Sequence, residues 1–195
     1  SLHKKFNEFT AILAGNSLLT MAFKILSEKD LKISENSKND LIKTLAKCAG
    51  HLGLAGGQYS DITFENKKIS KNNIIEMQKK KTGQLFGFCC ESIGIIKGVN
   101  SIQRRKLKEI GINIGLLFQI VDDLIDYKGD SKIVGKPTRR DAKKGKATLI
   151  GLMGYKDTLK FSENLKKKII HKVKKYGKKS KDLIQSVEFI LERKF

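Results

Sequence analysis

The sequence predicts an all-α protein, and three observations on its composition and its pattern of apolar residues lead to that prediction. Proline occurs once in 195 residues, at Pro137, so predicted helices are almost uninterrupted. Leu, Ile, Ala and Lys are plentiful whereas Val and Thr are sparse, which favours helices over strands. Apolar residues also recur with the helical period in several segments. The length suits one substantial domain, so we expect residues 1–195 to form a single helical bundle.

The formal net charge of +20 does not by itself indicate a nucleic-acid partner. Of the 40 basic residues only five are Arg, and the lysines are spread over nearly every predicted helix. A nucleic-acid-binding face would concentrate its charge and use Arg for phosphate contacts, so we expect no nucleic-acid partner. The basic balance favours an anionic substrate instead.

Cysteine usage and hydropathy predict a reduced, cytoplasmic environment. Cys48, Cys89 and Cys90 are odd in number and form no C-x-x-C pair, which argues against a disulfide framework or a zinc site. No apolar run approaches 18 residues without a charge or polar break, and no signal peptide is recognised. We therefore expect no stable membrane insertion.

The first two predicted helices cover residues 3–27 and 37–59. Apolar side chains recur over several turns of the first. The second ends in Gly56-Gly57, where consecutive glycines cost about 1 kcal/mol each relative to Ala. Their usual reason is the close approach of another helix backbone or of a ligand.

The third predicted helix covers residues 73–96. A polar loop over residues 60–71 comes before it, with Ser70 or Asn72 as its N-cap. Gly83 in the middle of this helix predicts a kink.

The kink at Gly83 would direct Lys81 and Thr82 inward. A surface lysine cluster is the alternative interpretation. It fits Lys79 and Lys80 well and Lys81 less well, and periodicity alone leaves the two interpretations equally supported.

The fourth predicted helix, residues 101–127, contains the strongest indication of chemistry. At about 100° per residue, Asp122, Asp123 and Asp126 share one flank, with Gln119 one turn earlier. Like charges on one face repel one another unless a cation lies between them. Hard oxygen ligands without His or Cys favour Mg²⁺ over zinc. A solvated acidic turn is the alternative, but the surrounding helix is the most apolar in the chain.

The segment from Lys128 to Gly145 is glycine-rich and basic, and it is the natural lid over an acidic metal site. It could equally be a solvated basic loop. Residues 147–195 predict two or three helices with a lysine-rich face, and they contain no recognisable chemistry.

Five segments, in order, resemble motifs of the trans-isoprenyl diphosphate synthases, the farnesyl and geranylgeranyl diphosphate synthase family. They are Ala11–Gly15 with Leu18–Thr20, Gly53–Gln58, Lys81–Gly83, Phe118–Asp126, and Gly135–Lys136 followed by Asp141, Lys146 and Thr148. Each is weak alone, but together they span about residues 3–155 and are highly specific. The Asp122-Asp123-x-x-Asp126 sequence is similar to the family's second aspartate-rich motif.

The resemblance implies an isoprenoid-synthase-type helical bundle that joins an allylic diphosphate to isopentenyl diphosphate, giving farnesyl or geranylgeranyl diphosphate. It also implies a homodimer that uses Mg²⁺. By similarity, three sets of side chains would serve the reaction: the metal ligands Asp122, Asp123 and Asp126, the diphosphate-binding Lys81, Lys136 and Lys146, and the catalytic Lys81, Thr82 and Gln119. Thr82 and Gln119 would lie beside the developing allylic cation.

Three departures separate the chain from the family pattern. The family's first aspartate-rich motif lies upstream of the segment that begins here, and no second acidic cluster occurs in the 195 residues. Asn16 stands where the family usually has Asp, and Arg139 where it usually has Gly. We therefore expect this polypeptide alone to be weakly active or inactive.

The main alternative function is a non-catalytic partner subunit of the same fold, which would keep the helices and lose part of the metal site. Retention of Lys81, Gln119, Lys136 and Lys146 argues against it, because a scaffold has no use for inward cations. A terpene cyclase would present an Asn/Ser/Glu-type second motif and lack the Lys-Thr-Gly segment. A nucleic-acid-binding helical domain would leave the three aspartates unexplained.

Overall fold

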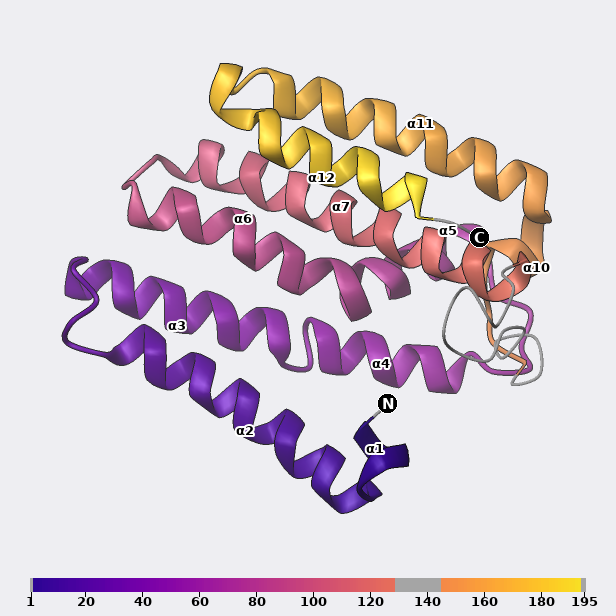
Figure 1. Ribbon diagram of the computed structural model, residues 1–195, viewed down its shortest axis with the longest axis horizontal. Coiled ribbons are helices and arrows are strands. Elements are labelled where there is room, and N and C mark those ends of the chain that lie inside the picture. The colour runs from indigo at the N-terminus through magenta and orange to yellow at the C-terminus, as the bar shows by residue number, and fades with distance from the viewer. Residues whose placement is uncertain (1, 129–144, 194–195) are drawn as a thin grey trace.

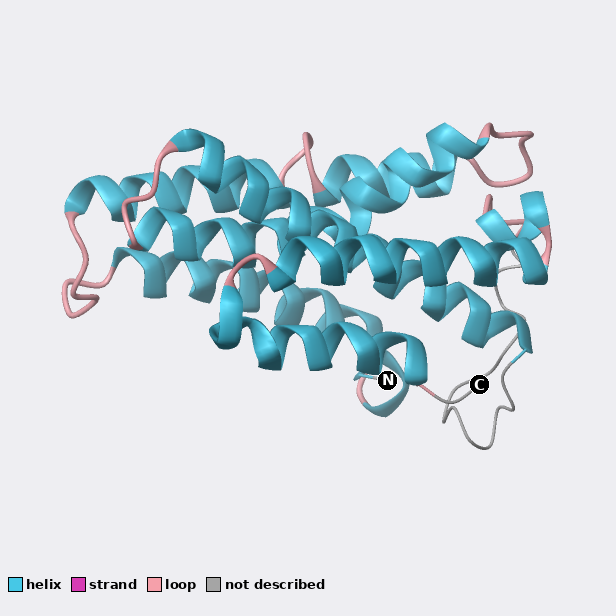
Figure 2. Ribbon diagram, turned by 90° about the horizontal axis from the view of Figure 1, so that it is seen from above, coloured by secondary structure: helices cyan, strands magenta, loops and turns pink. Residues whose placement is uncertain are grey.

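The computed structural model describes residues 2–128 and 145–193, and within these ranges every regular element is helical. The all-α prediction is therefore confirmed. The helices lie side by side in an elongated bundle, with α2 and α3 along one edge and α11 and α12 along the other (Figures 1 and 2). Helix α7 runs through the middle.

Among the described residues, the connections from α1 to α7 and from α10 to α12 are short. The bounds of the helices are α1 (Leu2–Lys5), α2 (Glu8–Ser27), α3 (Glu35–Ala49), α4 (Leu54–Thr63), α5 (Lys71–Gln78), the π-helical turn η1 (Lys79–Gly83), α6 (Gln84–Ile96), α7 (Ser101–Lys128), α10 (Leu149–Met153), α11 (Tyr155–Lys174), the 3-10 turn η2 (Gly177–Ser180) and α12 (Lys181–Glu192).

The helix predicted over residues 3–27 is divided in two. Asn7 is extended, with φ −158° and ψ 175°, and its side chain accepts a hydrogen bond from the backbone N–H of Thr10. This is an N-cap, so α2 begins at Glu8 and only the short α1 precedes it.

The helix predicted over residues 37–59 is also divided. The chain turns between Gly50 and Gly53, closed by a 2.9 Å bond from the Gly53 N–H to the Gly50 carbonyl. Helix α4 then continues to Thr63, so the loop expected from residue 60 starts at Phe64 instead. Consecutive glycines therefore mark the interior of α4 rather than the end of a longer helix.

The helix predicted over residues 73–96 is continuous but irregular. Ser70 caps it by accepting a hydrogen bond from the Asn73 N–H, so of the two predicted caps, Ser70 and Asn72, the first is confirmed. The irregularity expected at Gly83 is the π-helical turn η1, which ends at that residue. A π turn adds one residue to the helical repeat and so redirects the side chains that it contains.

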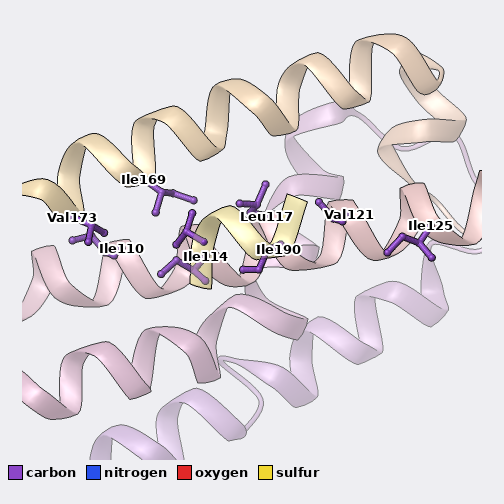
Figure 3. Close-up of a cluster of buried hydrophobic side chains, with 9 residues drawn as sticks. Ile110, Ile114, Leu117, Val121, Ile125, Ile169, Val173 and Ile190 are labelled. Carbon is purple, nitrogen blue, oxygen red and sulfur yellow. The ribbon is translucent and has the colours of Figure 1, made fainter. Parts of the chain in front are cut away.

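The hydrophobic core is built around α7 and has two parts. On one side, α7 contacts α11 and α12, and the labelled side chains converge between these helices (Figure 3). The buried members are Ile110, Ile114, Leu117, Val121, Ile125, Ile169, Val173, Val187 and Ile190. On the other side, α7 packs against α5 and α10 through Ile74, Met77, Leu116, Ile120, Leu124, Leu149 and Ile150. The aspartates of α7 therefore lie in a helix that the core fixes from both sides.

Helix α2 is the exception in this bundle. The structure describes it completely, and none of its residues is buried; Phe9 and Leu18 are 80 % and 66 % exposed. By length and composition it is the one described helix that could cross a membrane. The expected absence of stable membrane insertion is not tested by this finding and stays a prediction. A single such helix is weak support for a membrane span, because helices at protein interfaces have the same composition.

Candidate functional site

Residues that are far apart in the sequence meet in a small polar recess of about 10 Å³ beside the C-terminal half of α7. Its polar lining comes from α4, α5, η1, α7 and the segment before α10: Asp61, Gln78, Lys81, Gln119, Asp123, Lys146 and Thr148. Four of the predicted site residues are in this set. We take this recess as the candidate site.

Lys81 reaches the recess because η1 packs closely on α4. A side chain at Gly57 would place its Cβ 2.2 Å from the backbone nitrogen of Lys81, so only glycine allows this approach. The Lys81 Nζ then lies 2.6 Å from Oδ2 of the buried Asp61. Lys80 is exposed and Lys79 pairs with a neighbouring glutamate of its own helix. Lys81 is thus separated from the other two lysines, as the inward interpretation predicted.

Thr82, Gln119 and Asp123 form a hydrogen-bonded chain from η1 to α7. The Thr82 hydroxyl donates to Oε1 of Gln119 at 2.8 Å. Nε2 of Gln119 donates in turn to Oδ1 of Asp123, again at 2.8 Å. The other carboxylate oxygen of Asp123 accepts a 2.8 Å bond from Nε2 of Gln78. The structure therefore joins Thr82 and Gln119, the two residues predicted to lie beside the allylic cation.

The three aspartates of α7 have different surroundings. Asp123 and Asp126 are buried, at 7 % and 8 % exposed, whereas Asp122 is only partly buried. Both oxygens of Asp123 accept bonds from amides. Within residues 2–128 and 145–193, no three His, Cys, Asp or Glu side chains converge closely enough to hold a metal ion. Joint metal binding by all three aspartates therefore remains a prediction.

Three residues near the site were missed by the sequence reasoning. Asp61 follows the Gly-Gly-Gln sequence of α4, and Gln78 is a polar residue on the buried face of α5. Arg193 follows α12, and its guanidinium lies 4.3 Å from the centre of the Phe118 ring. Arg193 is one of few arginines in a lysine-rich chain, which is the one sequence signal that could have drawn attention to it.

Arg193 connects the C-terminal end of the described chain to the aspartate helix. Its Nη2 donates to the backbone carbonyl of Phe118 at 3.3 Å. Burial lowers the pKa of Arg193, and the negative charge of Asp122 opposes that shift. The Asp122 side of α7 is thus electrostatically coupled to Arg193, while the Asp123 side is held by amides.

Lys146 and Thr148 enter the recess from the segment before α10, where Thr148 caps the helix by accepting a bond from the Gly151 N–H. Lys136 and Arg139 lie outside the described residues. So does most of the predicted lid over residues 128–145.

Comparisons with known proteins identify the family to which this sequence is similar. The polyprenyl synthetase family model matches residues 1–187. Farnesyl diphosphate synthase from Geobacillus stearothermophilus is 37 % identical over 163 residues, which are 82 % of this chain and 55 % of that protein. Farnesyl diphosphate synthase from Escherichia coli is 32 % identical over 197 residues, which are 98 % of this chain and 66 % of that protein.

Solved structures show the same fold. The geranyltransferase from Helicobacter pylori complexed with magnesium and isoprenyl diphosphate superposes with a TM-score of 0.82 at 26 % identity, covering 98 % of this chain and 62 % of that one. An FPP/GFPP synthase from Zymomonas mobilis superposes with a TM-score of 0.82 at 33 % identity, covering 97 % of this chain and 64 % of that one. This chain therefore spans between about half and two thirds of the length of these relatives.

Proposed function

Because the chain belongs to the polyprenyl synthetase family, we propose that it serves the condensation of an allylic diphosphate with isopentenyl diphosphate. The products would be farnesyl or geranylgeranyl diphosphate. The observation that carries this proposal is the recess in which Lys81 lies near the hydrogen-bonded Thr82, Gln119 and Asp123. The farnesyl diphosphate synthases to which the chain is similar support the same reaction class.

The cations at this site suit the departure of a diphosphate group. Breaking the bond between an allylic carbon and a diphosphate develops negative charge on the leaving oxygen, and nearby cations stabilise that charge. Lys81 and Lys146 line the recess, and Asp61 restrains the Lys81 ammonium group. By similarity, Lys136 would supply a further cation.

The Thr82–Gln119 pair suits the positive charge that remains on the allylic fragment. The Thr82 hydroxyl donates a hydrogen bond to Gln119, which leaves the lone pairs of the Thr82 oxygen available to a neighbouring cation. The pair would therefore stabilise the cation through these lone pairs.

The aspartates of α7 have the donor chemistry that Mg²⁺ prefers. This ion is usually bound by one or two carboxylates together with substrate phosphates and water. We propose that Asp122 and Asp126 contact the ion, with Asp123, already held by two amides, in a supporting role. When bound, the ion would neutralise charge on the diphosphate.

We also propose that the protein is a cytoplasmic homodimer without a nucleic-acid partner. The exposed apolar face of α2 supports the dimer, since monomeric proteins rarely expose contiguous apolar surface on this scale. A second copy of the chain would remove that face from water.

A binding and turnover experiment tests the reaction class. Calorimetry with inorganic pyrophosphate should detect Mg²⁺-dependent binding that Lys81→Ala weakens at least about tenfold. The matched control is Lys80→Ala, the exposed neighbour in the same turn, which should bind as the unchanged chain does. The proposal is wrong if the unchanged chain does not bind pyrophosphate in the presence of Mg²⁺.

Product analysis then tests the expected weak activity. With geranyl diphosphate, isopentenyl diphosphate and Mg²⁺, mass spectrometry should find little product, because the 195 residues contain no second acidic cluster to complete a metal site. Rapid product formation that chelation abolishes would support the reaction class and contradict the weak-activity prediction.

The non-catalytic partner subunit remains the second candidate function. It is favoured by the finding that no three acidic, His or Cys side chains converge among the described residues. It predicts a chain that associates with a catalytic subunit and binds no pyrophosphate. The calorimetric experiment therefore separates the two functions.

A further inference from the structure

Gln78 is a buried polar side chain to which the proposed reaction assigns no role. It is 2 % exposed and is the last residue of α5, directly before the π turn that contains Lys81 and Thr82. The neighbouring buried positions of α5 are the apolar Ile74 and Met77. A buried amide is costly unless its polar atoms are paired, so its presence on this face requires an explanation.

The pairing of Gln78 is directed at Asp123. Its Nε2 donates to Oδ2 at 2.8 Å, and Gln119 donates to Oδ1 of the same carboxylate at 2.8 Å. Hydrogen bonds to an ionised group are stronger than those between neutral groups. Two such donors, one from α5 and one from α7, fix the rotation of the carboxylate as well as its position.

The fixed carboxylate determines the orientation of Gln119. An ionised carboxylate only accepts hydrogen bonds, so the NH₂ group of Gln119 must face Asp123. Its carbonyl oxygen therefore faces Thr82 and accepts a hydrogen bond from the Thr82 hydroxyl, with 2.8 Å between the two oxygens. A change at Gln78 would thus be transmitted through Asp123 and Gln119 to Thr82.

The carbonyl oxygen of Gln78 shows that packing alone does not explain this residue. Oε1 is buried and accepts no hydrogen bond from any of the described residues. A side chain retained for volume would be better replaced by an apolar one, which leaves no acceptor unpaired. The bond from Nε2 to Asp123 is the contact that only an amide supplies here.

We propose that Gln78 is a positioning residue that orients the Gln119–Thr82 pair through Asp123. Its consequence for ligand binding rests on the proposed function, whereas its effect on the orientation of Gln119 does not. Gln78 touches neither Thr82 nor any proposed reacting atom through a hydrogen bond of its own. It acts by restricting the rotation of two other side chains.

The first test uses the unliganded chain and is independent of substrate. In nitrogen-15 spectra, the side-chain amide signals of Gln119, assigned by their loss in Gln119→Leu, should move in Gln78→Met and exchange about tenfold faster with water. Met keeps the volume of Gln and removes the donor. Ile74→Val, on the same buried face, is the control and should leave these signals unchanged. Unchanged Gln119 signals in a folded Gln78→Met chain would overturn the proposal.

The second test is a double-mutant cycle on pyrophosphate binding with Mg²⁺. Gln78→Met should weaken binding about tenfold in the unchanged background, as is typical for loss of an outer partner of a ligating group. In the Gln119→Leu background the further loss should be clearly smaller, because the part transmitted through Gln119 is already absent and only the direct bond to Asp123 remains to be lost. Additive losses would overturn the proposal. Absence of binding by the unchanged chain would contradict the proposed function, and the spectra would still decide the role of Gln78.

Discussion

Helix α2 and the second half of α7 are both strongly apolar, yet their surroundings are opposite. The buried residues of α7 all lie between Ile110 and Asp126, and they contact helices on two sides. Helix α2 contains no buried residue along its entire length. Apolar composition alone therefore does not determine which helix of this chain is central.

The difference lies in how closely other backbones can approach. A Cβ at Gly111 of α7 would lie 2.2 Å from the Phe86 carbonyl oxygen, and one at Gly115 would lie 2.7 Å from the Cα of Gly83. Gly15 of α2, by contrast, has nothing within 4 Å of its Cβ position. The small residues of α7 have their partners within the described chain. We infer that those of α2 are suited to a partner outside it.

The largest expected effect comes from filling the contact between α6 and α7. Gly111→Val should lower the free energy of unfolding by at least about 3 kcal/mol, since the Phe86 backbone would have to move. The matched change in α2 is Gly15→Ala, which should raise stability by about 0.5–1 kcal/mol through helix propensity. Urea unfolding at concentrations where the chain is monomeric measures both. Similar changes in the two variants would show that the contrast between the helices is wrong.

The next largest difference in unfolding free energy between the two helices is expected when a leucine in each is truncated to alanine. Leu117 is 0 % exposed, so Leu117→Ala should cost about 2–5 kcal/mol through lost burial and an unfilled cavity. Leu13 is 64 % exposed, and Leu13→Ala should change the stability of the monomer by less than about 0.5 kcal/mol. The same unfolding measurements apply. A loss at Leu13 comparable with that at Leu117 would place α2 in the core of the single chain.

The sequence predicted α7 well because several independent signals coincide there. Its apolar residues follow the helical period, and Asn100 directly before it is a residue type that favours helix starts, as its bond from the Gln103 N–H confirms. The predicted 101–127 therefore differs by one residue from the observed Ser101–Lys128. The glycines at 56 and 57 correctly indicated a close backbone approach, which the contact between Gly57 and Lys81 provides.

The remaining features depend on tertiary contacts that periodicity does not reveal. Nothing local distinguishes a kink at Gly83 from the π turn that Lys79–Gly83 forms. In the sequence, Asp61 and Gln78 cannot be distinguished from ordinary polar residues. Only the packing of α4, α5 and α7 places both of them in one recess. The position of α2 at the surface was equally unpredictable, because exposed and buried apolar helices have the same local sequence pattern.

A smaller difference in unfolding free energy is expected when the hydroxyl of Thr82 or of Thr20 is removed. Thr82 bonds across from η1 to Gln119 of α7, whereas Thr20 bonds back to the Asn16 carbonyl within the exposed α2. Thr82→Val should therefore cost about 1 kcal/mol of unfolding free energy, since it leaves the partly buried Gln119 oxygen unpaired. Thr20→Val should stay within about 0.5 kcal/mol. If both variants unfold alike, the bond between η1 and α7 contributes nothing to stability.

The smallest effect on folding, and the most direct test of the exposed apolar face of α2, is expected from a charge placed on that helix. Leu18 is 66 % exposed, so Leu18→Lys should leave the unfolding free energy of the monomer within about 0.5 kcal/mol. If a second copy of the chain covers this face, the same change should shift the mass measured by sedimentation equilibrium from dimer toward monomer, because an unpaired ammonium would be buried. Ile102→Lys adds the same charge at a 54 % exposed position of α7 and should leave the mass unchanged. An unchanged chain that sediments as a monomer at every concentration would exclude self-association through α2 and leave its apolar face to a partner of another kind.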